Sequence, residues 1–377
     1  MVKRILLPYL SAGLGHMILA QAIADSVHAL RPDWELRLMD AAVELDDRLL
    51  QRTFVDLWKV ALKMPPFLTT AAFALERMAP GAARAVNHRS FRTSVPKAAK
   101  FLAEYKPDLV MSTHWACSHL FALARGKTAL PLYYIYGELG ETYSVVACGA
   151  DRYFTLTDRI EKGLERFGVP RARMQRVPLV VDQRMFTSDV PRDVLRRGLG
   201  VPADNLVVVL SLGGEGLGST MPFIRKFART VSGASLVVLT GRNTDLLRKV
   251  QETFANAGST PVGTVIALGY QEDISGVFAA ADVLAGKTGT GYAMMAMAMG
   301  VPLIVTHLGA PNERGNMLHI VENGFGWYCP RPGLFTERVS MIARERGTCR
   351  DSSNGHRPPE PGNGAEAIAA AIVDALS

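Results

Sequence analysis

Residues 287–291, Lys-Thr-Gly-Thr-Gly, form a glycine-rich turn between a short apolar run at 282–285 and a segment of helical character. Glycines leave backbone N–H groups accessible, and the first turn of a helix adds unpaired N–H groups and the positive end of its dipole. Such an arrangement binds anions, most naturally a diphosphate. A plain tight turn inside a doubly wound sheet has the same spacing, so the turn alone leaves both interpretations open.

Polar residues follow the next predicted strand, at 301–305. Asn312, Glu313, Arg314 and Asn316 lie in the loop after it. Because open parallel sheets bind ligands at their carboxyl edge, we expect this loop to reach the same ligand as the glycine turn.

A second glycine turn, Gly13-Leu-Gly15-His16, follows a predicted strand at 4–10 and precedes a helix expected from about residue 18 to 30. Its spacing is that of a dinucleotide-binding fingerprint, except that Ile18 occupies the third glycine position. A nicotinamide-cofactor interpretation is therefore weak, although Asp40 at the end of the second predicted strand keeps it open.

A third glycine turn, at residues 211–218, follows the predicted strand at 206–210 and allows close approach of the backbone to a phosphate. Polar residues also follow the predicted strands at 236–239 and 265–268. They are Arg242 and Asn243, directly after Gly241, and Gln271.

The elements that must position these turns are short apolar strands alternating with helices. This order predicts an α/β protein, and 377 residues suit two domains better than one. We place the domains at residues 1–183 and 204–362. A proline- and glycine-rich linker at 184–203 would join them, and a final helix would occupy 363–377.

Residues 48–106 carry an excess of positive charge, with eleven Lys or Arg against three acidic residues. Apolar residues recur there at helical spacing, with cations on the opposite face. One interpretation is a set of helices packed on the sheet, with basic outer faces. The other is a surface that meets an anionic membrane, with apolar side chains entering the interface and cations on phosphates. Nucleic acid is a third kind of partner for such a stretch.

Four cysteines without CxxC spacing indicate free thiols in a reducing compartment. No apolar run approaches the roughly 20 residues that span a bilayer. Pro8 and Gly13 interrupt the apolar opening segment, so we interpret it as a first strand and not as a signal peptide.

The block from 287 to 316 resembles the donor site of the two-domain (GT-B) glycosyltransferases. It is most similar to the branch that contains processive diacylglycerol glucosyltransferases, monogalactosyldiacylglycerol synthase and the N-acetylglucosaminyltransferase that makes lipid II. The motifs that carry the resemblance are the lysine-glycine turn at 287–291, Gly-Val-Pro at 300–302, Glu-Arg-Gly-Asn at 313–316, Gly-Gly-Glu-Gly at 213–216 and Thr-Gly-Arg-Asn at 240–243. The resemblance implies two Rossmann-like doubly wound domains facing a cleft, with the final helix packed back toward the first.

The same resemblance implies a reaction: transfer of a hexose, with inversion, from a UDP-sugar to a diacylglycerol-like lipid. Metal is not expected, because the chain has no Asp-x-Asp motif. The general base would be His16, which matches the histidine of the acceptor loop, or Glu138, which replaces an aspartate of the family. The implied donor-binding residues are Gly213, Gly214, Gly216, Gly241, Arg242, Asn243, Gln271, Thr288, Gly289, Thr290, Gly291, Asn312, Glu313, Gly315 and Asn316. The acceptor and membrane residues would be Gly13, Gly15, Phe54, Trp58, Lys59, Lys63 and Phe67.

Three residues depart from the family pattern. Met295 stands where a glutamate usually holds the ribose, Thr290 replaces a frequent proline, and Asn312 stands where a glutamine commonly meets the donor sugar. These departures predict weaker or different binding of UDP.

The expected partners are a UDP-sugar, a lipid acceptor and an anionic membrane surface, with no nucleic acid and no cofactor. The expected location is cytoplasmic, on the inner face of the membrane. Two alternatives remain: a GT-B enzyme acting on a soluble acceptor or as a UDP-sugar epimerase, and a binding protein that has lost catalysis.

Overall fold

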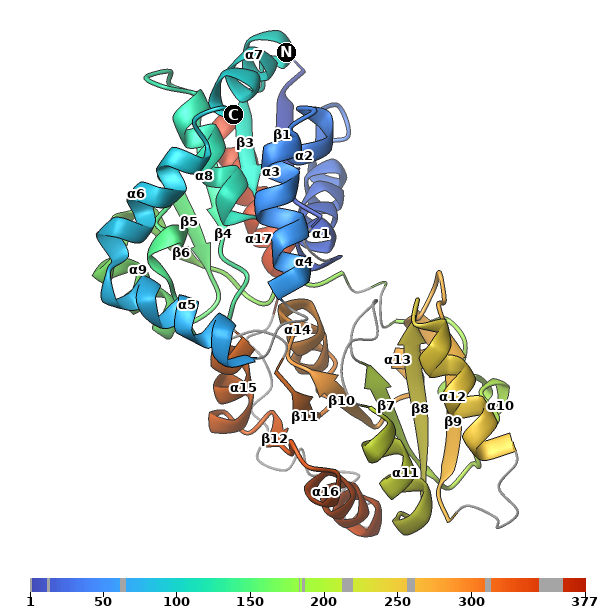
Figure 1. Ribbon diagram of the computed structural model, residues 1–377. Helices are drawn as coiled ribbons and strands as arrows, with labels where there is room; N and C mark the ends of the chain where they lie inside the picture. The colour runs from blue at the N-terminus through green and yellow to red at the C-terminus, as the bar shows by residue number, and fades with distance from the viewer. Residues whose placement is uncertain are drawn as a thin grey trace. The chain divides into compact units, whose positions relative to one another are not determined.

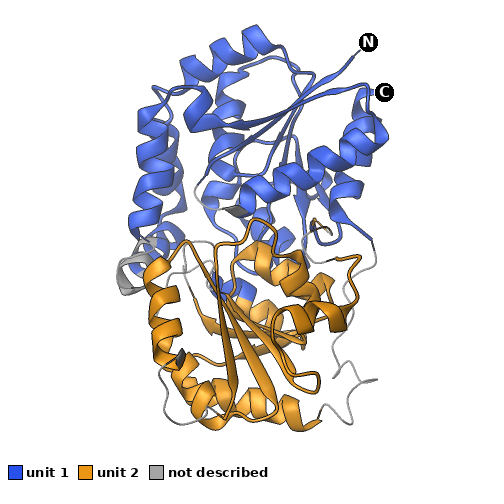
Figure 2. Ribbon diagram, turned by 90° about the vertical axis from the view of Figure 1, so that its right-hand side faces the viewer, with its two compact units in different colours: residues 1–181, 310–316, 360–377 blue, residues 182–309, 317–359 orange. Residues whose placement is uncertain are grey.

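The computed structural model describes residues 2–11, 14–61, 66–182, 184, 187–211, 220–255, 262–308, 313–345 and 362–377. The chain divides into two compact units (Figure 2). Unit 1 comprises residues 1–181, 310–316 and 360–377, and unit 2 comprises residues 182–309 and 317–359. Each unit is built on one six-stranded sheet, and every strand pairing in the two sheets is parallel, which confirms the predicted α/β class.

The sheet of unit 1 has the order β2-β1-β3-β4-β5-β6 (Figure 1). Its strands are β1 (Arg4–Tyr9), β2 (Glu35–Asp40), β3 (Leu109–Ser112), β4 (Leu132–Ile135), β5 (Arg152–Thr155) and β6 (Met174–Arg176). The strand order reverses between β1 and β3: β2 lies on one side of β1, and β3 to β6 follow on the other. Loops after these two strands therefore diverge and leave a crevice at the carboxyl edge, where such sheets bind ligands.

Helices cover both faces of this sheet, which explains why the central strands are buried apolar runs. On one face α1 (Leu14–Leu30) packs with α17 (Gly364–Leu376). The core of the other face includes side chains of α7 (Val95–Tyr105), α8 (Trp115–Ala124) and α9 (Asp158–Arg166). Two single turns of 3₁₀ helix, Ser144–Val146 and Arg171–Arg173, lie in loops.

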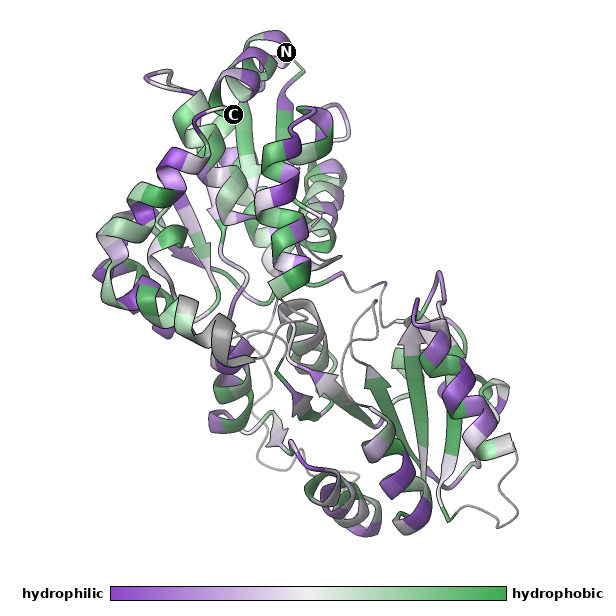
Figure 3. Ribbon diagram, in the orientation of Figure 1, coloured by the Kyte–Doolittle hydropathy of each residue, from purple (hydrophilic) through white to green (hydrophobic). Residues whose placement is uncertain are grey.

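The basic segment of unit 1 forms a chain of short helices between β2 and α7. They are α2 (Ala41–Glu44), α3 (Arg48–Leu50), a π-helical turn (Gln51–Asp56), α4 (Leu57–Ala61), α5 (Pro66–Met78) and α6 (Pro80–Ser90). Both α5 and α6 begin at a proline, which suits the first turn of a helix because its N–H has no intrahelical partner. Figure 3 shows hydrophobic and hydrophilic residues intermingled along α5 and α6.

The sheet of unit 2 has the order β12-β11-β10-β7-β8-β9 (Figure 1), so its chain reversal lies between β7 and β10. The strands are β7 (Leu206–Ser211), β8 (Ala234–Gly241), β9 (Thr264–Gly269), β10 (Val283–Lys287), β11 (Leu303–His307) and β12 (Gly326–Tyr328). The glycine turn at 287–291 directly follows β10 and so lies beside the reversal point. This is where the sequence predicted a ligand.

Helices also cover both faces of the sheet in unit 2. The core of one face includes side chains of α11 (Met221–Thr230), α12 (Thr244–Ala255) and α16 (Pro332–Glu345). The remaining helices are α10 (Arg192–Gly198), α13 (Ser275–Ala280), α14 (Thr290–Ala298) and α15 (Glu313–Glu322). The first turn of α15, up to Asn316, is grouped with unit 1 and the rest with unit 2.

Part of the expected linker at 184–203 is an integral helix of unit 2. Arg192 and Arg196 of α10 form ion pairs with Asp282 at 3.0 and 2.8 Å, and Asp282 also accepts a hydrogen bond from Val207 N at 2.8 Å. The two arginines of α10 therefore neutralise the Asp282 carboxylate, which in turn holds the start of β7. Proline and glycine content alone predicted a linker here because these long-range ion pairs leave no local signal.

Candidate active site

His16 lies in the first turn of α1, at the carboxyl edge of the unit 1 sheet. The helix begins at Leu14, four residues earlier than the sequence predicted, so His16 is part of the helix and not of the preceding loop. Thr113 and His114 directly follow β3. The chain reversal thus brings His16 and the 113–114 segment to the same crevice.

Two hydrogen bonds fix His16 against this segment. His16 Nδ1 lies 2.7 Å from the carbonyl oxygen of Thr113, and Thr113 Oγ1 donates to the His16 carbonyl oxygen at 2.9 Å. A carbonyl oxygen can only accept, so Nδ1 carries the proton of the neutral ring and Nε2 presents its lone pair. A histidine oriented in this way has the arrangement required of a general base.

His114 has a structural role that also places it beside His16. Its Nδ1 accepts a hydrogen bond from Ala116 N at 3.1 Å and so caps α8, while its ring lies 4.5 Å from that of His16. Burial lowers the pKa of His16, and burial together with the neighbouring His16 lowers the pKa of His114 further. Both rings are therefore neutral near pH 7. The sequence did not point to Thr113, because a backbone carbonyl has no side-chain signal.

Glu138 lies beyond β4 at the same edge of unit 1. Its Oε2 accepts a hydrogen bond at 2.7 Å from Nδ2 of Asn316, whose Oδ1 accepts from Leu139 N at 2.9 Å. The structure therefore brings together a predicted base and a predicted donor-binding residue. Asn316 itself is fully buried.

In unit 2 the strand before the predicted anion site is bent. The pairing of β10 with β11 shifts register between Gly286 and Lys287, and Gly286 has a φ of 143°. A Cβ at Gly286 would collide with the carbonyl oxygen of Ser211, so only glycine fits this close approach of β10 to β7. Sequence reasoning listed the later glycines and missed this one, since its constraint comes from the neighbouring strand.

The predicted phosphate turn leads directly into α14. Gly289 occupies the N-cap position, Thr290 and Gly291 open the helix, and Thr288 is fully buried. Tyr292 Oη lies 3.2 Å from the carbonyl oxygens of both Val209 and Ala285, which holds the first turn of α14 against the sheet. The N-terminal N–H groups of a nine-residue helix thus end at the reversal point of the sheet.

Predicted donor residues also lie after β8 and β9. The Arg242 guanidinium lies over the Tyr270 ring, 4.1 Å from its centroid, and Asn243 Oδ1 accepts a hydrogen bond from Leu246 N at 2.9 Å. Gln271 is exposed. Met295, at the position where the family places a ribose-binding glutamate, is buried in α14 with 5% of its surface exposed.

Several predicted site residues lie outside the described residues: Gly13, Lys63, Gly213, Gly214, Gly216 and Asn312. Gly15 is exposed in the first turn of α1. Glu313 and Gly315 are buried. A Cβ on Gly315 would lie 2.5 Å from Glu141 N, so this glycine is required by a close backbone approach.

Phe54 occupies a different place from the one expected for a membrane residue. Its ring stacks on Phe91 at 4.9 Å and meets Trp115 edge-on at 5.4 Å, so it is partly buried against the core of unit 1. Trp58 is half-buried, with its ring 6.5 Å from Phe73. Lys59 is exposed, and Phe67 lies in α5. The apolar positions of this segment therefore divide between two sides: Phe54 packs against the core and Trp58 is half-buried, whereas Leu57 is exposed.

The exposed apolar side chains of the basic segment are Leu57 and Val60 of α4, Leu75 and Met78 of α5, and Val86 of α6. Met78 is 82% exposed and Leu75 65%. The neighbouring α5 residues hold the helix in place: Glu76 Oε1 accepts from Ser144 N at 2.6 Å, and Arg77 pairs with Glu141. We call Leu57, Val60, Leu75, Met78 and Val86 the exposed apolar set.

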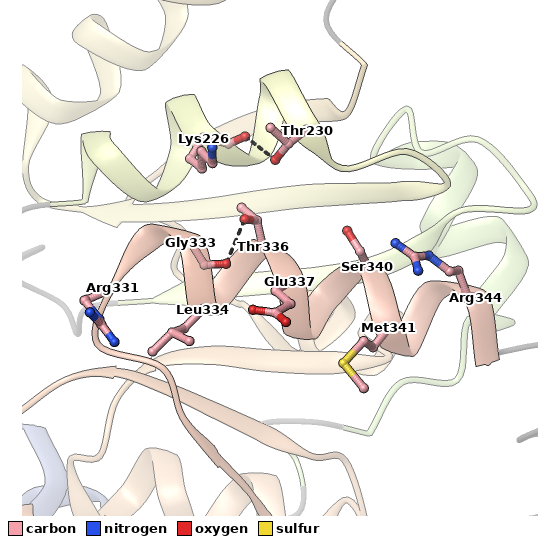
Figure 4. A pocket seen from close by; sticks show the side chains of 10 residues that line it. All are labelled: Lys226, Thr230, Arg331, Gly333, Leu334, Thr336, Glu337, Ser340, Met341 and Arg344. Atoms are coloured by element: carbon pink, nitrogen blue, oxygen red, sulfur yellow. Dashed lines mark hydrogen bonds between the residues drawn. The ribbon is translucent and has the colours of Figure 1, made fainter.

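A hollow of 880 Å³ lies between α11 and α16 of unit 2 (Figure 4). Its walls carry Lys226, Thr230, Arg331, Leu334, Glu337 and Arg344, among others. None of the predicted donor-binding residues that the structure describes lines it. The predicted anion site, at the N-terminus of α14, is a different place from this hollow.

No family model matches the chain. Among curated proteins, it is 26% identical over 258 residues to the chloroplastic monogalactosyldiacylglycerol synthase of Spinacia oleracea, which covers 64% of this chain and 48% of that protein. It is 24% identical over 173 residues to the processive diacylglycerol β-glucosyltransferase of Bacillus pumilus, covering 46% of this chain and 44% of that one. The chain spans about half the length of the curated relatives it matches.

Solved structures match over nearly the whole chain. Acinetobacter baumannii MurG has a TM-score of 0.63 at 13% identity, with coverage of 99% of both chains. Anabaena HepE, in complex with UDP and glucose, has a TM-score of 0.56 at 17% identity, with 99% of each chain covered. A putative UDP-N-acetylglucosamine 2-epimerase from Listeria monocytogenes has a TM-score of 0.65 at 14% identity and covers 100% of this chain and 97% of its own.

These structural likenesses show the fold, which is that of the GT-B glycosyltransferases. The fold predicted from the sequence is therefore confirmed. The resemblance to the monogalactosyldiacylglycerol synthase and diacylglycerol glucosyltransferase branch is confirmed by homologues that carry those names. Within the described part of the chain, no helix combines the length and the apolar character needed to cross a membrane.

Proposed function

We propose that this protein is a hexosyltransferase that moves a sugar from a UDP-sugar to a hydroxyl group of a diacylglycerol-like lipid, with inversion and without a metal ion. The observation that carries the proposal is the fixed, neutral His16 at the carboxyl edge of unit 1. The glycine turn before α14, at the corresponding edge of unit 2, and homologues named as diacylglycerol glycosyltransferases support it.

In the proposed reaction the acceptor oxygen attacks the anomeric carbon and its proton passes to His16 Nε2. The Thr113 carbonyl, 2.7 Å from Nδ1, keeps the tautomer that leaves Nε2 unprotonated and stabilises the imidazolium that forms. The bond between the anomeric carbon and the phosphate oxygen breaks on the opposite face, and its electron pair leaves with UDP. One displacement of this kind inverts the configuration.

Charge that develops on the leaving diphosphate needs stabilisation. The N-terminal N–H groups and dipole of α14 supply it when the β-phosphate lies at residues 288–291. Arg242, which follows β8, and Lys287, the last residue of β10, add positive charge at the same edge. These groups perform the electrostatic work that a divalent cation performs in other glycosyltransferases.

The pH dependence of the reaction follows from the lowered pKa of His16. Histidine has an ordinary pKa of about 6.5, and burial moves the pKa of His16 below it. The base therefore stays unprotonated as the pH falls through 6.5, and activity is lost only under more acidic conditions. The acidic limb of a kcat/KM profile is expected below pH 6.5, and a limb above that value would contradict the assignment of His16.

The exposed apolar set on α4, α5 and α6 supports a membrane surface as the source of the acceptor. These side chains are interspersed with exposed cations, including Lys59 and Arg89. Apolar side chains that enter the interface contribute roughly 25 cal/mol per Å² buried, and each cation near an anionic leaflet about 1 kcal/mol. A few of each give reversible attachment.

Replacing Leu75 and Met78 by serine is expected to weaken co-sedimentation with anionic vesicles at every salt concentration, because the apolar contribution is lost. Lys59→Gln with Arg89→Gln should instead reduce the sensitivity of binding to salt, since screening acts on charges. Val262→Ser, which alters an exposed valine of unit 2, is the matched control and should bind as the parent does. Equal binding to neutral and anionic vesicles would favour a soluble acceptor.

The proposed function is tested by incubation with a panel of UDP-sugars and mixed liposomes, with UDP release and lipid products as readouts. We expect UDP release that depends on both a UDP-hexose and a lipid hydroxyl, without added metal. Interconversion of UDP-sugars in the absence of acceptor would favour an epimerase. Binding of UDP without turnover on any acceptor would favour a protein that has lost catalysis.

A further inference from the structure

The loop at 138–141 and the segment at 314–316 dock against each other in unit 1, residue by residue and in opposite directions. Asn316 bonds Glu138 and Leu139, Gly315 lies on Gly140, and Arg314 Nη1 lies 3.4 Å from Glu141 Oε1. A Cβ on Gly140 would collide with the backbone of Gly315, and one on Gly315 with Glu141 N. Gly140 and Gly315 therefore face each other so closely that no side chain fits between the two backbones.

The orientation of the Asn316 amide is determined by its partners. Leu139 N–H can only donate, so the atom 2.9 Å from it is the carbonyl oxygen Oδ1, and Nδ2 is the group that faces Glu138 Oε2 at 2.7 Å. Because Asn316 is fully buried, its amide is a fixed donor to the carboxylate. A hydrogen bond to a carboxylate is stronger than one between neutral groups.

We propose that Glu138 is a positioning residue, which acts through its hydrogen bond with Asn316 and sets the 138–141 loop at the carboxyl edge of unit 1 that also carries His16, and that it is not itself the base. This inference rests on the proposed function for its meaning in catalysis. The pairing of Glu138 with Asn316 can be tested without it. In this arrangement the Asn316 side chain holds the 138–141 loop, and its implied role in donor binding stays a prediction.

The polarity of the pair can be broken and then restored. Asn316→Asp places a second carboxylate against that of Glu138, which leaves two acceptors facing each other. Glu138→Gln added to Asn316→Asp reverses the bond: the amide introduced at position 138 donates to one oxygen of the carboxylate introduced at position 316, while Leu139 N–H donates to the other. Glu138→Gln alone keeps an acceptor for Asn316 but removes the charge that strengthens the bond.

These bonds determine how the variants should rank in melting temperature and turnover. Asn316→Asp should lower both the melting temperature and the turnover, the latter by about tenfold or more. The double variant should recover the parental melting temperature and return turnover to within about threefold, and Glu138→Gln alone should lose about threefold or less. Asn323→Asp, the same change at an exposed site of the same region, is the control and should alter turnover by less than about twofold.

Asn316→Ser serves if Asn316→Asp fails to fold, because serine removes the donated bond without adding charge. Asn316→Ser should lower turnover and melting temperature less than Asn316→Asp does, and adding Glu138→Gln should not restore either property. A double variant that recovers its melting temperature but stays as inactive as a His16 variant would overturn the inference and make Glu138 the base. If neither property recovers, the Glu138–Asn316 bond does not position the loop. If the parent has no transferase activity, the melting temperatures alone still decide the pairing, so failure of the two proposals can be told apart.

Discussion

Replacement of His16 by alanine is expected to lower turnover by about 10² to 10⁴, the usual contribution of a general base, while UDP binding stays nearly intact. The expectation rests on the position of His16 at the carboxyl edge of unit 1, with Nδ1 bonded to the Thr113 carbonyl and Nε2 left to accept a proton. Steady-state kinetics and UDP-induced thermal shifts measure the two properties separately.

His28 provides the matched control for this experiment, since it lies at the other end of the same helix, α1. His28→Ala should leave turnover close to that of the parent protein. If the His16 variant keeps its turnover while Glu138→Gln is inactive, the proton is taken by Glu138. Full activity in both variants would remove the acceptor loop from the reaction altogether.

Gly289→Val is expected to abolish stabilisation by UDP. Ligand at 100 times its Kd stabilises a native protein by about 2.7 kcal/mol, which raises the melting temperature of a domain of this size by several degrees. Gly289 has φ −57° and ψ 139°, values that any residue adopts, so valine is compatible with the backbone. Its branched side chain would instead occupy the space before α14 where the diphosphate is expected.

Gly333→Val tests the specificity of this effect, because Gly333 is also in the first turn of a helix of unit 2 and a Cβ there meets nothing within 4 Å. It should keep the full response to UDP. A normal response in the Gly289 variant would place the diphosphate elsewhere. A response to another nucleotide but none to millimolar UDP would remove the assignment of uridine.

The order of strands and turns was predictable because local patterns determine it. Buried parallel strands are short apolar runs, and Gly13-Leu-Gly15-His16 and the turn at 287–291 each mark the junction of a strand with a helix. The carboxyl-edge location of His16 and of the α14 N-terminus follows from the parallel topology. Nothing beyond residue order was needed to expect them there.

The partners of these residues were not predictable, since they depend on contacts between distant segments. Thr113 orients His16 through a backbone carbonyl 97 positions away, and Asn316 meets Glu138 across 178 positions. Gly286 is required by the neighbouring strand, and Phe54 packs on Phe91 and Trp115. Helical periodicity identified the apolar face of the basic segment but could not tell whether protein or solvent covers it.

The central claim is tested most directly by following a labelled hexose from its UDP-sugar into an organic-extractable product. Vesicles that contain diacylglycerol and anionic lipid are compared with vesicles that lack diacylglycerol and with water-soluble alcohols, for the parent protein and His16→Ala. We predict a labelled lipid only with diacylglycerol vesicles and the parent protein, in the presence of a chelator. Label that enters a soluble product, or a labelled lipid formed equally well by the His16 variant, would contradict the account.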